Sequence, residues 1–365
     1  MPIPSPDRYA MTQFPAPEPT PLSLGDLDYA LPSGSIAPEP VRPRDRSRLL
    51  VVEREKGVWT DSLFAALDTH LRPGDVLVLN NTRVLRARVF GTLARTGRPV
   101  EVLFAKPIEE DCWEALLRPG RRVRVEDTIS FANGQQATVG EETDHGLRRV
   151  RLSGPGRTTI AELLETQGLL PLPPYLERPP TAADATDYQT VFGTRSGAIA
   201  APTAGLHFSP EVFGSLRRRG VEVAELTLHV GVGTFAPVRT DNPADHLLKP
   251  ERYEIPETTA RRLDAARSEG RRIIAVGTTT TRTLEYVFAA HGRFVAGGGE
   301  TDLYILPGYR FQAIDGLLTN FHLPRSTLLL LVAAFARRDL VMAAYRHAVA
   351  DGYRFYSYGD CCLFL

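Results

Sequence analysis

The chain has 365 residues, of which 43% are hydrophobic, and its formal net charge at pH 7 is zero. This length supports two domains with separate cores, and it contains no run of about 18 apolar residues, the length that a membrane span requires. Because the net charge is zero, any contact with nucleic acid must depend on local basic patches.

The three cysteines and the basic residues narrow the class further. An odd count of cysteines in a chain this long does not make a disulfide framework, and no Cys/His spacing suggests zinc. No secretory signal opens the chain. We therefore expect a cytoplasmic protein without a metal. All but three of the 43 basic residues are arginine, so we use individual arginines only where a motif supports them.

The first third of the chain reads as a leader followed by strands. Residues 1–24 hold many prolines and few charges, which predicts a poorly ordered segment. Residues 47–54 read as a buried strand, and residues 61–71 have helical spacing that stops at Pro73-Gly74. Residues 75–84 read as a strand that runs into a polar turn.

Residues 84–154 differ from the flanking segments in their hydrophobic pattern. Short runs with period-two alternation separated by turns predict a small antiparallel β-barrel or sandwich. This segment holds 12 basic and 10 acidic residues, so it is weakly basic and could bind RNA. A solvated barrel surface explains the same composition.

Residues 155–365 alternate helices and strands again. We expect helices near 159–166, 210–219, 258–269, 281–290 and 326–337, and strands at 221–230, 272–278 and 301–307. Together with residues 25–83 they predict a discontinuous α/β domain into which the barrel of residues 84–154 is inserted.

Segments in this second half place small or hydroxylic residues after strands, where α/β proteins bind ligands. Residues 196–208 contain Pro202, Thr203 and Gly205 and end on His207, which can transfer protons near neutral pH. Small residues let a backbone approach a ligand closely. We expect a binding loop here.

Residues 228–238 form the second such segment. Gly231 and Gly233 allow close backbone approach, Thr234 offers a hydroxyl, and His229 stands just before them. A glycine bulge at a strand end is the alternative interpretation.

The third segment, residues 276–285, runs from a strand through Gly277 and four threonines into a helix. Free N–H groups at a helix start together with hydroxyls make a cradle for an anionic or polar ligand. We expect Thr278, Thr279 and Thr280 to contact a ligand, while a threonine that merely caps the helix is the alternative.

The last segments lie near the C-terminus. Asn320 and His322 precede an apolar helix, and a structural role for His322 is the alternative. Residues 353–360 cluster aromatic side chains before Asp360. Such rings could stack a base or face a sulfonium, and an aromatic core is the other reading.

In order along the chain, these segments resemble the S-adenosylmethionine:tRNA ribosyltransferase-isomerase family of queuosine biosynthesis. The resemblance covers roughly Leu24 to Leu365. The strings that carry it are LPSGSIAPEP, SRLLVVER, LNNTRVLRAR, YQTVF, APTAGLHF, LHVGVGTF, VGTTTTRTLE, TDLYILPGYRF, LTNFHLPRSTLLLLVAAF and YRFYSYGD. The proline-rich leader, the stretch 193–196 and the CCLFL ending depart from the family's pattern, but no motif loop is lost.

The resemblance implies a transferase and isomerase whose larger α/β domain carries a small inserted β-barrel. The family transfers the ribosyl part of S-adenosylmethionine to 7-aminomethyl-7-deazaguanine at the wobble position of tRNA. The ribosyl unit is isomerised to give epoxyqueuosine, and adenine and methionine leave. The implied partners are therefore this tRNA and S-adenosylmethionine as ribosyl donor, with no metal and no membrane, and we expect a monomer.

The reaction needs a base near the ribose 5′-carbon and an acid for the departing adenine. We expect these among His207, His229, His322 and Asp360, without assigning individual roles. The cofactor-binding prediction comprises Thr203, Gly205, Gly231, Gly233, Thr234, Thr278, Thr279, Thr280 and Asn320.

The predicted tRNA-binding residues are Arg83, Arg86, Arg88, Arg282 and Arg325, and for the last two a structural ion pair is the alternative. A noncatalytic RNA-binding protein remains a rival interpretation. A phosphoribosyl-type transferase fits less well, because its acidic pair and phosphate loop are missing.

Overall fold

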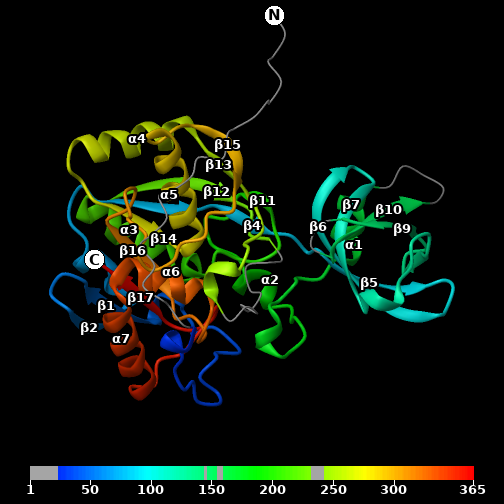
Figure 1. The fold of residues 1–365 in the computed structure, drawn as a ribbon, viewed down its shortest axis with the longest axis horizontal. Coiled ribbons are helices and arrows are strands. Elements are labelled where there is room, and N and C mark those ends of the chain that lie inside the picture. The colour runs from blue at the N-terminus through cyan, green and yellow to red at the C-terminus, as the bar shows by residue number, and fades with distance from the viewer. Residues whose placement is uncertain (1–23, 144–145, 154–158, 232–241) are drawn as a thin grey trace, which may run out of the picture. The chain divides into compact units, whose positions relative to one another are not determined.

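The computed structural model describes residues 24–143, 146–153, 159–231 and 242–365 (Figure 1). Its contacts divide the chain into two compact units. The first comprises Met1–Asn80, His207–Leu228 and Pro237–Leu365, and the second comprises Asn81–Leu206 and His229–Ala236. The sequence-based leader (residues 1–24) falls outside the described residues except for Leu24.

The first unit is built on a nine-stranded sheet in the order β15-β13-β12-β3-β14-β16-β17-β1-β2. The pairs β12–β3, β3–β14, β14–β16 and β17–β1 are parallel, and the other neighbours are antiparallel. The strands are β1 (Arg48–Glu53), β2 (Val58–Leu63), β3 (Val76–Asn80), β12 (Glu222–Leu228), β13 (Glu251–Ile255), β14 (Ile273–Val276), β15 (Gly297–Thr301), β16 (Gly316–Asn320) and β17 (Cys361–Phe364).

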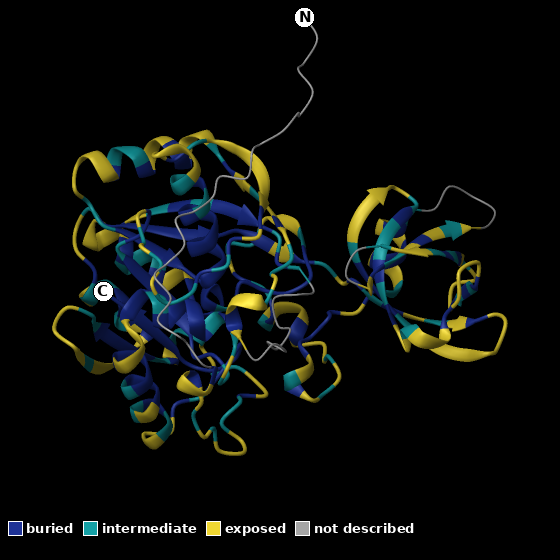
Figure 2. Cartoon of the chain, in the orientation of Figure 1, coloured by how far each residue is buried: buried dark blue, intermediate teal, exposed yellow. Residues whose placement is uncertain are grey.

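The central strands of this sheet are short continuous apolar runs. Every residue of β3, β14 and β16 is buried, as expected of parallel strands covered on both faces. Figure 2 shows this buried interior in dark blue, with exposed residues on the outer sides of the helices.

Helices flank the sheet: α3 (Pro210–Arg219), α4 (Glu257–Ser268), α5 (Thr278–His291), α6 (Thr327–Ala336) and α7 (Arg338–Ala350), with short 3₁₀ turns at Leu24–Leu27, Arg44–Arg46, Phe64–His70 and Pro243–Asp245. Helix α5 contacts β3, β12, β14 and β16, so it lies along the middle of the sheet. Ser209 and Ser326 cap α3 and α6 by accepting backbone N–H bonds.

The second unit contains a closed barrel in the order β10-β7-β6-β5-β8-β9. Its strands are β5 (Arg88–Leu93), β6 (Arg98–Glu109), β7 (Cys112–Arg118), β8 (Thr128–Phe131), β9 (Gln136–Glu142) and β10 (Arg148–Ser153). Helix α1 (Ile160–Gln167) adds Ile160, Leu163 and Leu164 to the barrel core and begins with a capping box on Thr159.

The rest of the second unit consists of a two-stranded sheet and short helical segments. Strands β4 (Thr82–Val84) and β11 (Arg195–Ala198) pair in parallel as a two-stranded sheet. The short helical segments outside the barrel are Pro174–Leu176, α2 (Asp184–Asp187) and Thr203–His207, whose last residue belongs to the first unit, and a 3₁₀ turn at Gly120–Arg122 follows β7.

The fold class predicted from sequence, a mixed α/β unit with a small antiparallel β-barrel, is confirmed. Two local predictions are wrong. Residues 61–71 start inside strand β2 and continue as a 3₁₀ helix rather than an α-helix. Residues 302–306 form no strand, because the Arg282 side chain donates to the carbonyls of Thr301 and Leu303 in place of a neighbouring strand.

The predicted boundaries at residues 84 and 154 remain predictions for the ends of the inserted domain. The second unit extends beyond them on both sides, and after residue 154 helix α1 packs into the barrel core. No helix in the described part of the chain is long and apolar enough to cross a bilayer.

Candidate active site

Four parallel strands of the first unit end at one edge of the sheet. Asn80 ends β3, and its side chain donates to Leu228 O at 2.9 Å and accepts from Leu228 N at 3.0 Å. Its Nδ2 also lies 3.5 Å from Thr279 Oγ1 at the start of α5. Asn80 therefore joins β3, β12 and α5, at the edge where α/β sheets bind ligands.

The threonines that follow β14 lie inside the first turns of α5. Thr280 Oγ1 donates to Val276 O at 2.7 Å, and Thr281 Oγ1 donates to Gly277 O at 3.1 Å. These two hydroxyls satisfy backbone carbonyls at the end of β14 and at the N-cap of α5 rather than a ligand. Thr278 and Thr279 keep slightly accessible side chains, so they are the better candidates for contact.

His207 lies buried between two polar side chains. Asn320 Nδ2 donates to Tyr356 O at 3.0 Å and lies 3.1 Å from His207 Nε2, so this nitrogen accepts. The ring proton is then on Nδ1, which lies 2.8 Å from Ser47 Oγ. Burial, with the charges of Arg44 and Arg354, lowers the pKa of His207 well below its ordinary value. His207 is thus neutral, and both of its nitrogens are occupied.

His322 is also held in the interior. Its Nε2 lies 2.8 Å from Thr319 Oγ1, and its side chain is buried. Burial lowers the pKa of His322 to about 3, so the ring is neutral at physiological pH. This placement supports the structural alternative for His322.

Asp360 closes a turn at the start of β17. Its carboxylate accepts from the backbone N–H groups of Arg48 and Arg354, each at 2.8 Å. Burial raises the pKa of Asp360 above its ordinary value. A Cβ at Gly359 would lie 2.5 Å from Arg354 O and Phe355 C, so only glycine fits this turn.

In the second unit, His229 is held against the backbone and remains partly exposed. Its Nδ1 lies 2.8 Å from Thr82 Oγ1, and the Thr82 hydroxyl also lies 3.4 Å from Arg195 O. A Cβ at Gly197 would lie 2.6–2.8 Å from three atoms of the His229 ring. The missing side chain at position 197 therefore makes the space that the imidazole occupies.

The other predicted ligand residues have mixed placements. Thr203 is partly exposed. Gly205 is buried, and a Cβ there would lie 2.7 Å from Phe192 Cζ and 2.8 Å from Thr190 Cγ2, so packing explains this glycine. Gly231 is partly exposed, and Gly233 and Thr234 lie outside the described residues.

The predicted tRNA-binding arginines divide into exposed and engaged side chains. Arg83, Arg86 and Arg325 are exposed. Arg88 pairs with Glu101 at 3.2 Å. Arg282 is buried and pairs with Glu251 at 2.6 Å, a placement that favours a structural ion pair.

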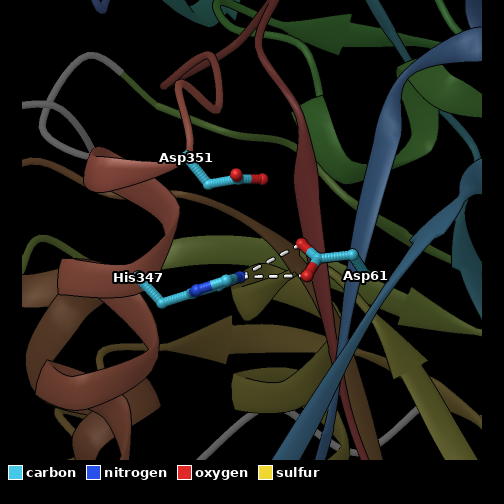
Figure 3. A group of neighbouring side chains, drawn as sticks. All are labelled: Asp61, His347 and Asp351. Carbon is cyan, nitrogen blue, oxygen red and sulfur yellow. Dashed lines mark hydrogen bonds and ion pairs between the residues drawn. The ribbon is translucent and has the colours of Figure 1, made fainter.

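One group in the described residues has metal-ligating geometry: Asp61, His347 and Asp351 (Figure 3). His347 Nε2 lies 3.0 Å from Asp61 Oδ2. The Arg48 guanidinium contacts both carboxylates and stacks 3.7 Å from the centre of the Tyr353 ring. A fixed cation thus already compensates these acids, and we assign no metal to them.

An open cleft of about 580 Å³ lies beside β13 and β15, lined by residues 252–257 and 296–300. None of the predicted site residues lines this cleft. It is therefore separate from the edge at which Asn80 and the start of α5 meet.

Four residues of these arrangements were missed by reading the sequence: Ser47, Asn80, Thr82 and Gly197. The string LNNTRV, with two amides and a hydroxyl directly after a buried strand, carried a signal for Asn80 and Thr82. Ser47 and Gly197 act through residues 160 and 32 positions away in the sequence, so local patterns could not single them out.

The parallel strand edge, the helix that begins there and the closed β-barrel define a two-unit α/β protein of the class that binds ligands at a sheet edge. The family described as queuosine biosynthesis protein matches residues 24–364, and the chain belongs to this family.

Similar proteins agree with that assignment. The chain is 50% identical to the S-adenosylmethionine:tRNA ribosyltransferase-isomerase of Moorella thermoacetica, over 94% of this chain and all of that protein. It is 47% identical to the enzyme of the same name from Staphylococcus saprophyticus, with the same coverage. The crystal structure of S-adenosylmethionine tRNA ribosyltransferase from Thermotoga maritima is 36% identical, covers 93% of this chain and all of that one, and superposes with a TM-score of 0.54.

Proposed function

We propose that this protein transfers the ribosyl part of S-adenosylmethionine to 7-aminomethyl-7-deazaguanine at the wobble position of tRNA and isomerises it. Adenine and methionine are released, and the product is epoxyqueuosine. The observation that carries the proposal is the 50% identity, over 94% of the chain, to a ribosyltransferase-isomerase. The site geometry supports the assignment of individual residues that follows.

The start of α5 suits the ribosyl donor. The first turn of a helix leaves backbone N–H groups without partners inside the helix, and these N–H groups favour anionic or hydroxylic ligand atoms. Thr278 and Thr279 add hydroxyls there, and Asn80 fixes the turn against β3 and β12. We assign Thr278 and Thr279 to S-adenosylmethionine, while Thr280 supports the helix.

His229 is our candidate for proton transfer. The reaction removes a proton beside the sulfonium, whose positive charge makes that proton more acidic, and it delivers a proton to adenine. When the Thr82 hydroxyl donates to Arg195 O, it accepts from His229 Nδ1–H, which fixes the tautomer that carries its lone pair on Nε2. His207 and His322 are neutral and buried, so we assign them positioning roles.

The test is adenine release from S-adenosylmethionine in the presence of precursor tRNA. Wild-type protein should release adenine, and His229→Ala should lower kcat by about 10²–10⁴-fold while the fold stays intact. Near-normal turnover of folded His229→Ala would remove His229 from the mechanism. A wild-type protein that binds tRNA but releases no adenine would support the noncatalytic RNA-binding alternative.

We also propose that the protein is a cytoplasmic monomer that needs no metal for this reaction. Light scattering should give a mass close to 40.2 kDa. Adenine release that persists after chelator treatment would support metal independence, whereas activity restored only by an added metal would contradict it.

A further inference from the structure

The end of the barrel where β7 finishes carries a group of exposed arginines. Four arginines fall within the seven residues 118–124, which start at the last residue of β7, and a fifth begins β6. All five are exposed, and none forms an ion pair with another described residue. This barrel arginine group consists of Arg98, Arg118, Arg121, Arg122 and Arg124.

A buried carboxylate fixes the loops that carry this group. Asp127 accepts from Arg95 Nε at 2.7 Å and Nη2 at 3.0 Å, and from the Arg124 backbone N–H at 2.8 Å. Arg95 Nη2 also donates to Arg122 O at 3.3 Å. Asp127 is therefore occupied by the scaffold, and it holds the guanidinium-bearing loops together.

Few acidic side chains balance the group. Glu101 is engaged with Arg88 at 3.2 Å, and Glu142 lies 3.7 Å from Arg148. Glu126 is the exposed carboxylate between Arg124 and Asp127. Guanidiniums on adjoining strand ends and loops that form no ion pair with a described residue repel one another, and a bound polyanion relieves that repulsion.

An exposed aromatic ring lies in the same row of the barrel. Phe90 on β5 is 53% exposed. It pairs with Glu101 on β6, which in turn pairs with Arg118 on β7, so the three residues share the outer face. A large ring left in solvent next to arginines can stack on an unpaired base.

We propose that this face of the barrel binds RNA, with the barrel arginine group on the phosphodiester backbone and Phe90 against an unstacked base. Guanidinium forks match phosphate oxygens, and the ring selects single-stranded or looped RNA over a duplex. The inference rests on the proposed function, because that function makes tRNA the substrate. These residues differ from the arginines that the sequence indicated.

The experiment measures the binding of an unmodified tRNA transcript over a range of salt concentrations, together with adenine release on precursor tRNA. The test variants are Arg118→Ala/Arg121→Ala and Phe90→Leu. The matched control is Arg293→Ala/Arg346→Ala, which removes two exposed arginines of the first unit that also form no ion pair with described residues.

The double arginine variant should bind tRNA about tenfold more weakly, and the slope of log K against log salt should shrink by about 1.4. Phe90→Leu should weaken binding by about tenfold without changing that slope. In turnover, the KM for tRNA should rise while kcat and the KM for S-adenosylmethionine stay unchanged. The control should match wild type, and duplex DNA should bind less tightly than tRNA.

Wild-type affinity and slope in the double arginine variant would overturn the proposal, as would equal wild-type affinity for tRNA and duplex DNA. If the wild type releases adenine and the variants keep its KM for tRNA, this RNA surface alone is refuted. If the wild type releases no adenine but the variants lose tRNA affinity, the RNA surface stands and the proposed function falls.

Discussion

Replacing Gly197 with alanine should displace the ring of His229, the proposed proton-transfer residue, while leaving the histidine itself unchanged. The new Cβ would lie 2.6–2.8 Å from Cε1, Nδ1 and Nε2 of His229, whereas ordinary contacts begin at 3.4 Å. The ring must therefore retreat by roughly 0.6–0.8 Å, which would lengthen the 2.8 Å contact with Thr82 to roughly 3.4–3.6 Å, where the hydrogen bond is weak or lost. A misplacement of about 1 Å can cost about 10²-fold in rate.

We expect Gly197→Ala to lower kcat for adenine release by about 30- to 100-fold. The φ angle of +154° is unfavourable for alanine and adds strain of about 1–3 kcal/mol. The matched control is Gly134→Ala, at φ +83°, because a Cβ there meets no atom within 4 Å. The control carries backbone strain alone and should keep its turnover.

Two further measurements make this prediction refutable. If Gly197 acts through the imidazole, then Gly197→Ala/His229→Ala should be no slower than His229→Ala alone. Thr82→Val should slow turnover, and Thr82→Ser should restore it, because serine keeps the hydroxyl. A folded Gly197→Ala protein with kcat within about threefold of wild type would refute the reasoning.

Three other outcomes are expected. Thr279→Val should weaken S-adenosylmethionine binding by about 1 kcal/mol in calorimetry, whereas Thr280→Val should not, since the Thr280 hydroxyl donates to Val276 O; equal effects of the two substitutions would contradict the separate roles of these threonines. The pKa of His322 is depressed in the folded protein, so its contribution to stability is complete above pH 6.5 and is lost as the pH falls below 6.5 towards about 3. The unfolding free energy should therefore drop on acidification by up to about 1.4 kcal/mol per pH unit from this group, and His322→Gln should show a shallower pH dependence; an unchanged slope would argue against a buried neutral ring. Gly359→Ala should destabilise the protein by about 2 kcal/mol or more in denaturant unfolding, because its Cβ meets backbone atoms at 2.5 Å, and Gly352→Ala, at φ +70° with open space around it, should cost less.

Local patterns predicted the elements whose sequence carries a strong period or a clear end signal. The apolar run of residues 328–335 became α6, and the alternating runs after residue 84 became a closed barrel. The strand at Gly297–Thr301 was missed, because three consecutive glycines have low strand propensity and the pairing with β13 decides their conformation. The strand predicted at residues 301–307 does not form, because the Arg282 side chain donates to two backbone carbonyls there. Local periodicity in the sequence does not reveal such a contact.

Local sequence patterns predicted even less about the roles of residues in the candidate site. The sequence places three histidines in loops of similar small and polar residues. It therefore gives no means to decide which of them transfers a proton. Burial ranks them: His207 and His322 are enclosed and neutral, and His229 keeps an exposed portion beside Gly197 and Thr82. Contacts between residues far apart in the sequence decide that burial. The sequence therefore predicts which residue types form the site, and only the packing assigns His229 to proton transfer and the other two histidines to positioning.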